Sequence, residues 1–389
     1  MSRSFDILYQ SVCNTLQTQH KYRQLPQQHD QSKPLLDFSG NDYLGLSRHP
    51  DVIAAACDVA QRYGVGSTGS RLLSGNVDFY EAFEAQIAWD KHTENALIFN
   101  SGYQANLSVL ACLLDSQVLG ESAILLFDKL NHASLYQAAF LSGAQLVRYH
   151  HVDMNHLELL MRRYREQQPD RKLVVVSETV FGMDGDVAPV AQLIDLCVRF
   201  DALLYLDEAH STGLLGERGY GESTLYDLSA VEHVIMGSFS KALGSSGAYV
   251  ACSNVVKNYL VNRCVGFIYS TALSPMVVAA AQSAWALLPN LMSQRDQLLV
   301  RAARLRGQLQ SIGINTGDST TSIIPLILGD EARVMLLKQC LRAQGFELSA
   351  IRPPTVPPKT ARLRMSLNVK HSDEDLNGFL TYLANVCGM

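Results

Sequence analysis

The chain has 389 residues, of which 47% are hydrophobic and 18% charged, and its formal net charge is −5. This length exceeds what a single hydrophobic core usually supports, so we expect two domains or one large domain with an appendage. The composition excludes a disordered or fibrous chain, and the acidic balance excludes a basic surface for nucleic acid or an anionic membrane, which leaves small-molecule chemistry.

Targeting segments and metal motifs are not evident in the sequence. The N-terminal residues lack the apolar core of a signal peptide, and no segment approaches the ~18 consecutive apolar residues of a membrane span. The eight cysteines are scattered, without a C-x-x-C pair or a histidine at zinc-ligand spacing. We therefore expect reduced, mostly buried thiols, no metal site and a cytoplasmic location.

The first residues are polar, glutamine-rich and weakly helical, and we expect residues 1–45 to form an N-terminal arm. A short strand and a turn rich in Asn, Asp and Gly are predicted within Leu35–Ser47, and a helix over Asp51–Tyr63. The remainder is expected to divide into a large domain, 46–275, and a small C-terminal domain, 276–389.

The stretch Gly64–Gly69 matches the G-x-G-x-x-G expression for dinucleotide binding. That motif has mechanical meaning only when it follows a strand and opens a helix. Here it follows an alanine-rich helical stretch, so we predict a flexible loop near a ligand and reject a nicotinamide dehydrogenase.

After a predicted amphipathic helix over Val77–Lys91, short apolar runs alternate with helical patterns such as Gln104–Leu114, Leu157–Arg165 and Val190–Phe200. This alternation predicts an α/β fold with a mostly parallel sheet that helices cover on both faces. The predicted strands are Ala96–Phe99, Ala123–Phe127, Leu173–Ser177, Leu203–Leu206, Val234–Met236 and Ala248–Ala251.

The pattern changes toward the C-terminus. Helical sequence dominates from Ser274 to about Ile312, which is long enough to bridge two domains. The tail predicts a compact α+β unit with strands at Ile323–Leu328 and Ala361–Leu367, a helix over Ala332–Gln344 and a last helix from about Asp373.

Lys241 lies in the stretch Val234–Gly247, where an apolar run leads into serines and glycines. Small neighbours let a planar ligand approach the backbone, and a lysine there can form a Schiff base with an aldehyde cofactor such as pyridoxal phosphate. Taken alone, the stretch favours a solvated lysine in a glycine-rich turn, so the decision depends on the rest of the chain.

Ligands of an open parallel sheet bind at the carboxyl ends of its strands, and polar residues follow several of the predicted strands. Asp207 ends one strand and His210 comes three positions later. A buried carboxylate there could keep a pyridine nitrogen protonated, although Asp207 could equally cap a helix and His210 could be structural. Glu178 ends the preceding strand.

Other strand ends carry further candidates. The stretch Asn100–Asn106 opens a helix through a glycine, which suits phosphate, and His132 could stack on a flat ring. Arg352 precedes a rigid proline segment and could bind a carboxylate with its planar fork. We expect His150, His151 and His156 to be solvated.

Six segments together resemble the α-oxoamine synthases, a family of pyridoxal-phosphate enzymes with the aspartate-aminotransferase fold (fold type I). The resemblance runs from about residue 35 to the C-terminus, and a proline segment at Ile351–Pro357 with Ile268–Thr271 most resembles the member that condenses L-alanine with a pimeloyl thioester in biotin biosynthesis. The six segments are Asn41–Ser47, Gly69–Gly75, Asn131–Ser134, Met183–Asp186, Asp207–His210 and Ser238–Lys241.

The resemblance implies roles for the cofactor-contacting residues. Lys241 would carry the cofactor, Asp207 would contact its pyridine nitrogen and His210 its phenolic oxygen, and His132 would stack on the ring. Glu178 is expected among the cofactor contacts. The phosphate would be bound by Gly102, Tyr103 and Ser238, with Ser270 and Thr271 reaching it from the other subunit of a homodimer.

The resemblance also implies substrate contacts for Arg352, Asn41, Thr355 and, by a looser match, Arg23. Gly182 departs from the family, because many relatives have there a serine that contacts the cofactor, and Asp115–Glu121 predicts a longer surface loop. Two rival hypotheses stay open: a sister synthase that uses glycine or serine with another acyl-CoA, and a non-catalytic subunit that retains the fold.

Overall fold

The computed structural model describes residues 4–19, 21–25, 35–120 and 122–387, and the chain forms two compact units. Unit 1 comprises residues 1–40, 183–185 and 298–389, and unit 2 comprises 41–182 and 186–297. The N-terminal segment is thus grouped with the C-terminal residues. Helix α13 (Met292–Ser311) contributes to both units, since the division falls at Leu298.

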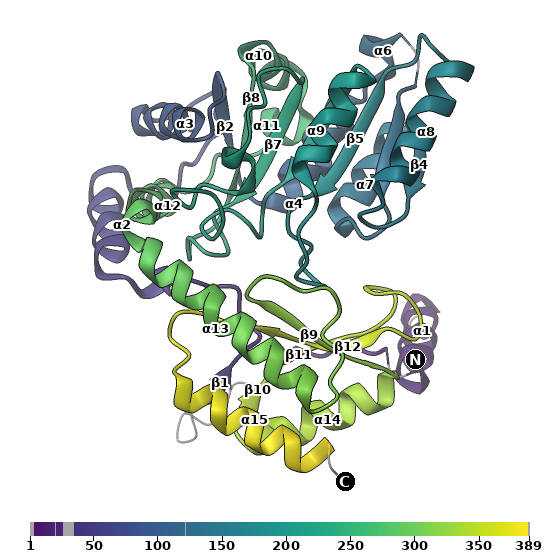
Figure 1. The fold of residues 1–389 in the computed structure, drawn as a ribbon. Helices are drawn as coiled ribbons and strands as arrows, with labels where there is room; N and C mark the ends of the chain where they lie inside the picture. The colour runs from purple at the N-terminus through teal and green to yellow at the C-terminus, as the bar shows by residue number, and fades with distance from the viewer. Residues whose placement is uncertain (1–3, 20, 26–34, 121, 388–389) are drawn as a thin grey trace. The chain divides into compact units, whose positions relative to one another are not determined.

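Unit 2 contains a seven-stranded sheet in the order β2-β8-β7-β6-β5-β3-β4, whose strands lie side by side in Figure 1. The five strands from β7 to β4 are parallel, and β8 is antiparallel to both of its neighbours, β7 and β2. The strands are β2 (Asn95–Phe99), β3 (Ile124–Asp128), β4 (Gln145–Tyr149), β5 (Leu173–Glu178), β6 (Ala202–Asp207), β7 (His233–Ser238) and β8 (Ala248–Cys252).

Helices cover both faces of this sheet. Alternate strand residues, such as Leu125 and Phe127 of β3, join one buried cluster with α4 (Gly102–Ala105), α7 (Ala133–Ser142) and α10 (Asn254–Arg263), whereas Leu126 points to the opposite face. Helices α8 (Met154–Gln167) and α9 (Val190–Arg199) pack on that opposite face. The remaining helices of unit 2 are α2 (Pro50–Tyr63), α3 (Asp78–Asp90), α5 (Ala111–Leu113), α6 (Ser116–Leu119), α11 (Val265–Ile268) and α12 (Pro275–Leu287).

Unit 1 is built on a three-stranded antiparallel sheet with the order β11-β12-β9, against which α14 (Glu331–Ala343) packs. A second, two-stranded sheet pairs β1 (Leu36–Asp37) with β10 (Phe346–Glu347), so the early chain is held by residues near the C-terminus. Helix α1 (Ser4–Thr18) has no buried residue. The other elements are β9 (Ile323–Gly329), β11 (Ser349–Ile351), β12 (Ala361–Ser366) and α15 (Asp373–Cys387).

The six strands predicted in the first two-thirds of the chain, the mostly parallel sheet and the α/β class are confirmed. Strand β4 was not predicted, because Gln145 and Arg148 interrupt its apolar pattern at the sheet edge. The predicted helix over Gln104–Leu114 is broken by a π-helical turn at Asn106–Leu110. The expectation of mostly buried cysteines is wrong, since three of the seven with described side chains are buried.

Two further features of the described residues are relevant to the predictions. Gly64–Gly69 is a loop that directly follows helix α2 and not a strand, and it leads into a turn. The expected loop at Asp115–Glu121 contains the short helix α6, which Asp115 caps, and Glu121 lies outside the described residues. Within the described ranges, no helix is both long and apolar enough to cross a membrane.

Candidate active site

Three neighbouring parallel strands of unit 2 end in polar residues at the same edge of the sheet. Glu178 ends β5, Asp207 ends β6 and Ser238 ends β7, and Glu178 and Asp207 are direct register partners. All three side chains are buried. Because parallel strands place their carboxyl ends together, this edge is the expected ligand-binding position of an α/β sheet.

Asp207 is held by hydrogen bonds to both of its carboxylate oxygens. Oδ1 accepts from the backbone N–H of Ala209 at 2.9 Å, and Oδ2 accepts from the side-chain amide of Asn106 at 2.7 Å. These two donors fix the orientation of the carboxylate. The alternative role as a helix cap is wrong, because turns rather than a helix follow the residue.

Asn106 was not among the predicted site residues. Its amide nitrogen also donates to Ser134 Oγ at 3.0 Å, and its oxygen accepts from Tyr205 Oη at 2.9 Å. The residue begins the π-helical turn, whose altered pitch changes which side chains face the sheet. The polar stretch Asn100–Asn106 was noted in the sequence, but a helical pattern does not reveal a π turn.

His132 lies close enough to both Asp207 and Lys241 to interact with each of them electrostatically. Burial desolvates the imidazole and lowers the pKa of His132. The Asp207 carboxylate opposes this shift, and the Lys241 ammonium reinforces it. His132 begins α7, where its Nδ1 lies 2.8 Å from Ser134 Oγ. The structure therefore brings His132, Asp207 and Lys241 near one another.

Glu178 belongs to the same cluster, and its surroundings shift its pKa. Burial and the neighbouring Asp207 carboxylate raise its pKa well above the usual value, and Lys241 opposes them only in part. These causes favour the neutral form of the Glu178 carboxyl group.

The turn that carries Lys241 joins β7 to the antiparallel β8. Its backbone is fixed by hydrogen bonds from Gly244 N to Lys241 O at 2.9 Å and from Phe239 N to Gly247 O at 3.0 Å. Gly244 and Gly247 have positive φ angles of 64° and 100°, which other residues rarely adopt. The alternative of a freely solvated lysine is wrong, because Lys241 is partly buried and interacts with His132 and Glu178.

His210 is buried and its Nδ1 lies 2.8 Å from Tyr43 Oη. The imidazole also lies over Gly182, where an added Cβ would overlap His210 Nε2. The glycine that departs from the family pattern therefore leaves room for His210 in this position. Tyr43 itself was inside a noted motif but was not predicted as a site residue, since its partner lies 167 positions away.

A helix start faces the end of β7. Ser101 caps α4 by accepting from Gln104 N, and the helical run continues from Gly102 through α5. A Cβ at Gly102 would lie 3.9 Å from Ser238 Cβ, so the two predicted phosphate contacts are adjacent. Tyr103, the next residue of the helix, is 49% exposed. Free backbone N–H groups at a helix start suit an anion.

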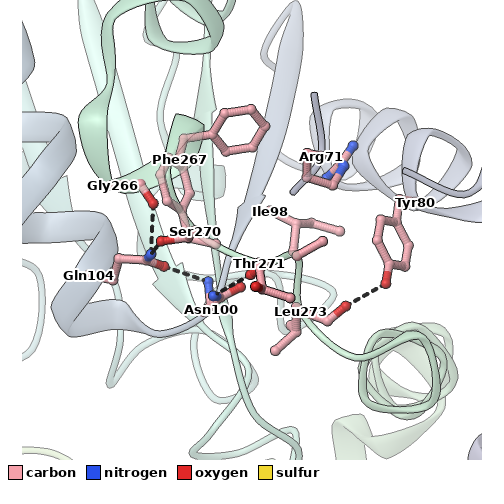
Figure 2. A pocket seen from close by; sticks show the side chains of 12 residues that line it. Arg71, Tyr80, Ile98, Asn100, Gln104, Gly266, Phe267, Ser270, Thr271 and Leu273 are labelled. Atoms are coloured by element: carbon pink, nitrogen blue, oxygen red, sulfur yellow. Dashed lines mark hydrogen bonds between the residues drawn. The ribbon is translucent and has the colours of Figure 1, made fainter. Parts of the chain in front are cut away.

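Ser270 and Thr271 line a small pocket beside α4 (Figure 2). Gln104 donates to Gly266 O at 2.8 Å and to Ser270 Oγ at 2.7 Å, and Asn100 donates to Thr271 O at 2.8 Å. Figure 2 shows these amides gathered around the segment, which they fix to the end of β2. Ser270 is partly buried and Thr271 is exposed.

The expected substrate-binding residues fall into two groups. In unit 1, Arg23 donates to Thr355 Oγ1 at 3.1 Å. Burial and the charge of Arg23 both lower the pKa of Arg352, so the two guanidinium groups are close to each other. In unit 2, Asn41 Oδ1 accepts a hydrogen bond from Tyr43 Oη at 3.2 Å.

His151 contradicts the expectation of a solvated histidine. Its Nδ1 lies 3.0 Å from Asp128 Oδ1 and its Nε2 lies 2.8 Å from Asp186 Oδ2. Burial alone would lower the pKa of His151, but the two aspartates raise it to about 10. A cationic imidazole therefore joins the ends of β3 and β4 to the segment after β5.

His150, Asp153 and His156 bring their potential ligand atoms within 4.8 Å of one another. The group lies at the start of α8, where Asp153 caps the helix by accepting from His156 N at 2.9 Å. His156 Nδ1 accepts from His150 N at 3.0 Å. These contacts explain the cluster as a helix cap, and His150 is exposed, as expected.

The donor set of the site fits pyridoxal phosphate. A carboxylate with both oxygens oriented by donors suits a protonated ring nitrogen, a partly buried lysine suits an aldehyde, and a helix start beside Ser238 suits a phosphate. The lysine and the carboxylate both act on His132, so the three side chains lie near one another.

Comparisons with known proteins agree with this fit. The family model for class I and II aminotransferases matches residues 33–383. An 8-amino-7-oxononanoate synthase from Gluconacetobacter diazotrophicus is 43% identical over 389 aligned residues, which cover 97% of this chain and 96% of the relative. A synthase of the same name from Geobacter sulfurreducens is 41% identical over 348 residues, covering 89% and 87%.

Among solved structures, serine palmitoyltransferase with pyridoxal phosphate bound as an internal aldimine matches with a TM-score of 0.87 and 26% identity. The match covers 99% of this chain and 98% of the other. The fold is therefore that of pyridoxal-phosphate-dependent aminotransferases, and pyridoxal phosphate is the cofactor.

Proposed function

Because the chain belongs to the class I and II aminotransferase family and is one of its pyridoxal-phosphate-dependent acyltransferases, we propose that it condenses L-alanine with a pimeloyl thioester. The products are 8-amino-7-oxononanoate, CO₂ and the free thiol of coenzyme A or of an acyl carrier protein. The reaction is a step of biotin biosynthesis, and the cytoplasm is the proposed location.

The observation that carries this proposal is the match along nearly the whole chain to the Gluconacetobacter diazotrophicus synthase, whose name states the product. The likeness to serine palmitoyltransferase, at 26% identity, supports the same fold and cofactor and names a sister reaction. The specificity for alanine is therefore the part that needs a direct test.

Pyridoxal phosphate, when bound, supplies an aldehyde that exchanges amines and a conjugated ring that accepts electrons from the substrate's α-carbon. Lys241 would hold the cofactor covalently, and its amine, when free, would remove the α-proton of the substrate and later return a proton. The turn of β7 and β8 keeps this amine next to the carboxyl edge of the sheet.

Asp207 would keep a proton on the ring nitrogen, and a protonated ring is an effective electron acceptor. Asn106 and Ala209 N fix the carboxylate for this task. His132 would lie against the face of the ring, and His210 would contact the phenolic oxygen from a position set by Tyr43 and Gly182. Glu178, whose neutral form is favoured by burial and by the Asp207 carboxylate, lines the site.

Gly102, Tyr103 and Ser238 bind the phosphate, with Ser270 and Thr271 contributed by the second subunit of a homodimer. The surface around Thr271 supports a dimer, because Thr271 bridges to Ser70 and large apolar side chains nearby are exposed. Five of these side chains are 48% to 83% exposed: Val65, Leu72, Leu73, Val265 and Tyr269.

Arg352 receives the alanine carboxylate through the two parallel N–H groups of its guanidinium. Asn41 lies beside the amino acid, and Arg23 with its partner Thr355 contacts the substrate from the N-terminal segment. Burial and the charge of Arg23 lower the pKa of Arg352. An anionic substrate would offset the repulsion between these two cations.

The assignment of Lys241 is tested by the visible absorbance of the purified protein. The wild type should be yellow, and Lys241→Ala should lose the lysine-linked band while its circular dichroism is unchanged. Lys129→Ala, which removes an exposed lysine of the same unit, should keep the band. Retention of that band in Lys241→Ala would refute the assignment.

The substrate assignment is tested with a panel of amino acids and acyl thioesters. Alanine with pimeloyl-CoA should give the highest kcat/KM. Much faster turnover of glycine or serine with another acyl-CoA would assign the chain to a sister synthase, and absence of any turnover with a bound cofactor would support a non-catalytic subunit.

A further inference from the structure

A fully buried ion pair lies directly behind the proposed active site. Lys91, the residue after α3, and Glu208, the residue after β6, both have side chains with 0% exposure and form a salt bridge. The remaining donors of Lys91 Nζ bind Tyr220 O and Ser223 Oγ, each at 2.8 Å. Glu208 Oε1 accepts from Ser223 N at 2.6 Å.

A contribution to the stability of the fold does not explain why this ion pair is buried here. Burying two opposite charges costs desolvation energy that their attraction repays only in part, and well-packed apolar residues often serve a fold equally well. Burial lowers the pKa of Lys91, and the charges of Glu208 and Glu222 oppose this shift. Such a pair is therefore a costly way of joining α3 to the sheet.

The position of Glu208 in the chain suggests a different reason for the pair. It directly follows Asp207 and comes two positions before His210. Its backbone is also fixed, since Glu208 N donates to Met236 O at 2.7 Å and its carbonyl accepts from Ser211 N and Thr212 N. Neighbouring residues at a strand end point to opposite sides, so holding Glu208 on one side directs Asp207 toward Asn106 on the other.

The surroundings of the pair leave little freedom for adjustment. Gly221 has a φ angle of 107°, and a Cβ there would overlap the Glu208 carboxylate and lie 2.9 Å from Lys91 Nζ. Glycine is thus the residue type that fits at position 221, where the loop contacts the ion pair. A rigid support of this kind is what a carboxylate needs if it must meet a ring nitrogen with little error.

We propose that the Lys91–Glu208 ion pair is a positioning device that holds Asp207 and His210 in register with the cofactor. The inference rests on the proposed function, because Asp207 and His210 have their roles only in a pyridoxal-phosphate site. Lys91 and Glu208 act through these neighbours and touch neither cofactor nor substrate.

The decisive variant replaces both charges together. Lys91→Met leaves a buried carboxylate without its cation and should lower the melting temperature. Lys91→Met/Glu208→Gln removes both charges and should recover much of the lost melting temperature. If the pair is a positioning device, the double variant stays impaired: its Kd for pyridoxal phosphate should rise at least about tenfold and its kcat at saturating cofactor should fall at least about tenfold.

A spectroscopic readout accompanies these measurements. The pH at which the absorbance of the lysine-bound cofactor changes depends on the hydrogen bonds to its ring, so it should shift in the double variant. If the pair contributes only to stability, the melting temperature, the cofactor Kd, kcat and this pH should all return to the wild-type values in the double variant. That result would overturn the proposal.

The matched control is a Lys–Glu pair in unit 1, Lys338–Glu347, with an N–O distance of 2.9 Å. Lys338→Met/Glu347→Gln should leave the cofactor Kd and the absorbance transition unchanged. If the Lys91 double variant fails to fold, Glu208→Asp decides instead, since it keeps the charge but shortens the side chain by one methylene. An unchanged cofactor Kd in that variant would overturn the proposal.

Failure of this proposal is distinguishable from failure of the proposed function. A wild type that binds pyridoxal phosphate but does not convert alanine and pimeloyl-CoA contradicts the function and leaves the effect on cofactor Kd measurable. A wild type that converts both substrates, with a double variant equal to it in every readout, contradicts the positioning role alone.

Discussion

The cationic His151 should make the stability of the fold depend on pH. Burial opposes its charge, but Asp128 and Asp186 overcome this effect and raise the pKa of His151 from 6.5 to about 10. A shift of this size corresponds to at most about 5 kcal/mol, at about 1.4 kcal/mol for each tenfold change in proton affinity. Because the side chain is 19% exposed, solvent screening should reduce the measured value to about 3 kcal/mol.

The direction of the pH dependence follows from the raised pKa. The folded protein binds the proton more tightly than the unfolded chain, so the stabilisation is complete below pH 6.5 and is lost as the pH rises through 10. His151→Asn is neutral at every pH and lacks this dependence. Between pH 7.5 and 9.5 the wild type should therefore lose about 2 kcal/mol more than the variant.

Urea unfolding followed by circular dichroism, with saturating cofactor and equal protein concentrations, gives the free energy of unfolding at each pH. His150→Asn is the matched control, because the neighbouring side chain is 69% exposed and its removal should leave the wild-type slope. Parallel curves for the wild type and His151→Asn would refute the assignment of a cation between the two aspartates.

Three further predictions concern the site. Asp207→Asn should still bind pyridoxal phosphate but lose at least about 100-fold in kcat, because the charge that supports the protonated ring is gone; unchanged turnover would mean that another group supports it. Glu178→Gln should lose less stability than the wild type as the pH rises above 4.5, because an acid with a raised pKa destabilises the fold once the unfolded chain ionises; equal loss in urea unfolding would contradict this. Gly182→Ser, although it restores the residue common in the family, should displace His210 and weaken cofactor binding about tenfold in an absorbance titration, and tighter binding would show that the imidazole moves without cost.

The elements that the sequence predicted well are those with strong local patterns. Six strands of the large sheet are continuous apolar runs, and the acids at their ends, Glu178 and Asp207, stand next to those runs in the chain. Parallel strands bring such ends together whatever lies between them. The gathering of Asp207, His132 and Lys241 could therefore be predicted from the order of strands and the family motifs.

The features that were missed depend on partners far away in the chain. His151 looks like a surface histidine until Asp128 and Asp186, 23 and 35 positions away, are placed beside it. The Asp207–Asn106 bond joins residues 101 positions apart and requires a π turn that no local pattern signals. Single-sequence periodicity carries no information about such pairings.

The antiparallel strand β8 has a consequence for how the enzyme is made. Among the described residues, β2 hydrogen-bonds in the large sheet only with β8, which is synthesised about 150 residues later, and β2 leads directly into Gly102 and Asn106. When the ribosome has just added Lys241, β8 has not yet been synthesised and β2 has no strand to pair with. The helix start next to Ser238, which follows β2, is then not held in place by the sheet. Assembly of the cofactor site is thereby delayed until residue 252 has left the exit tunnel, and a chain truncated before it should form the parallel strands but not retain the cofactor.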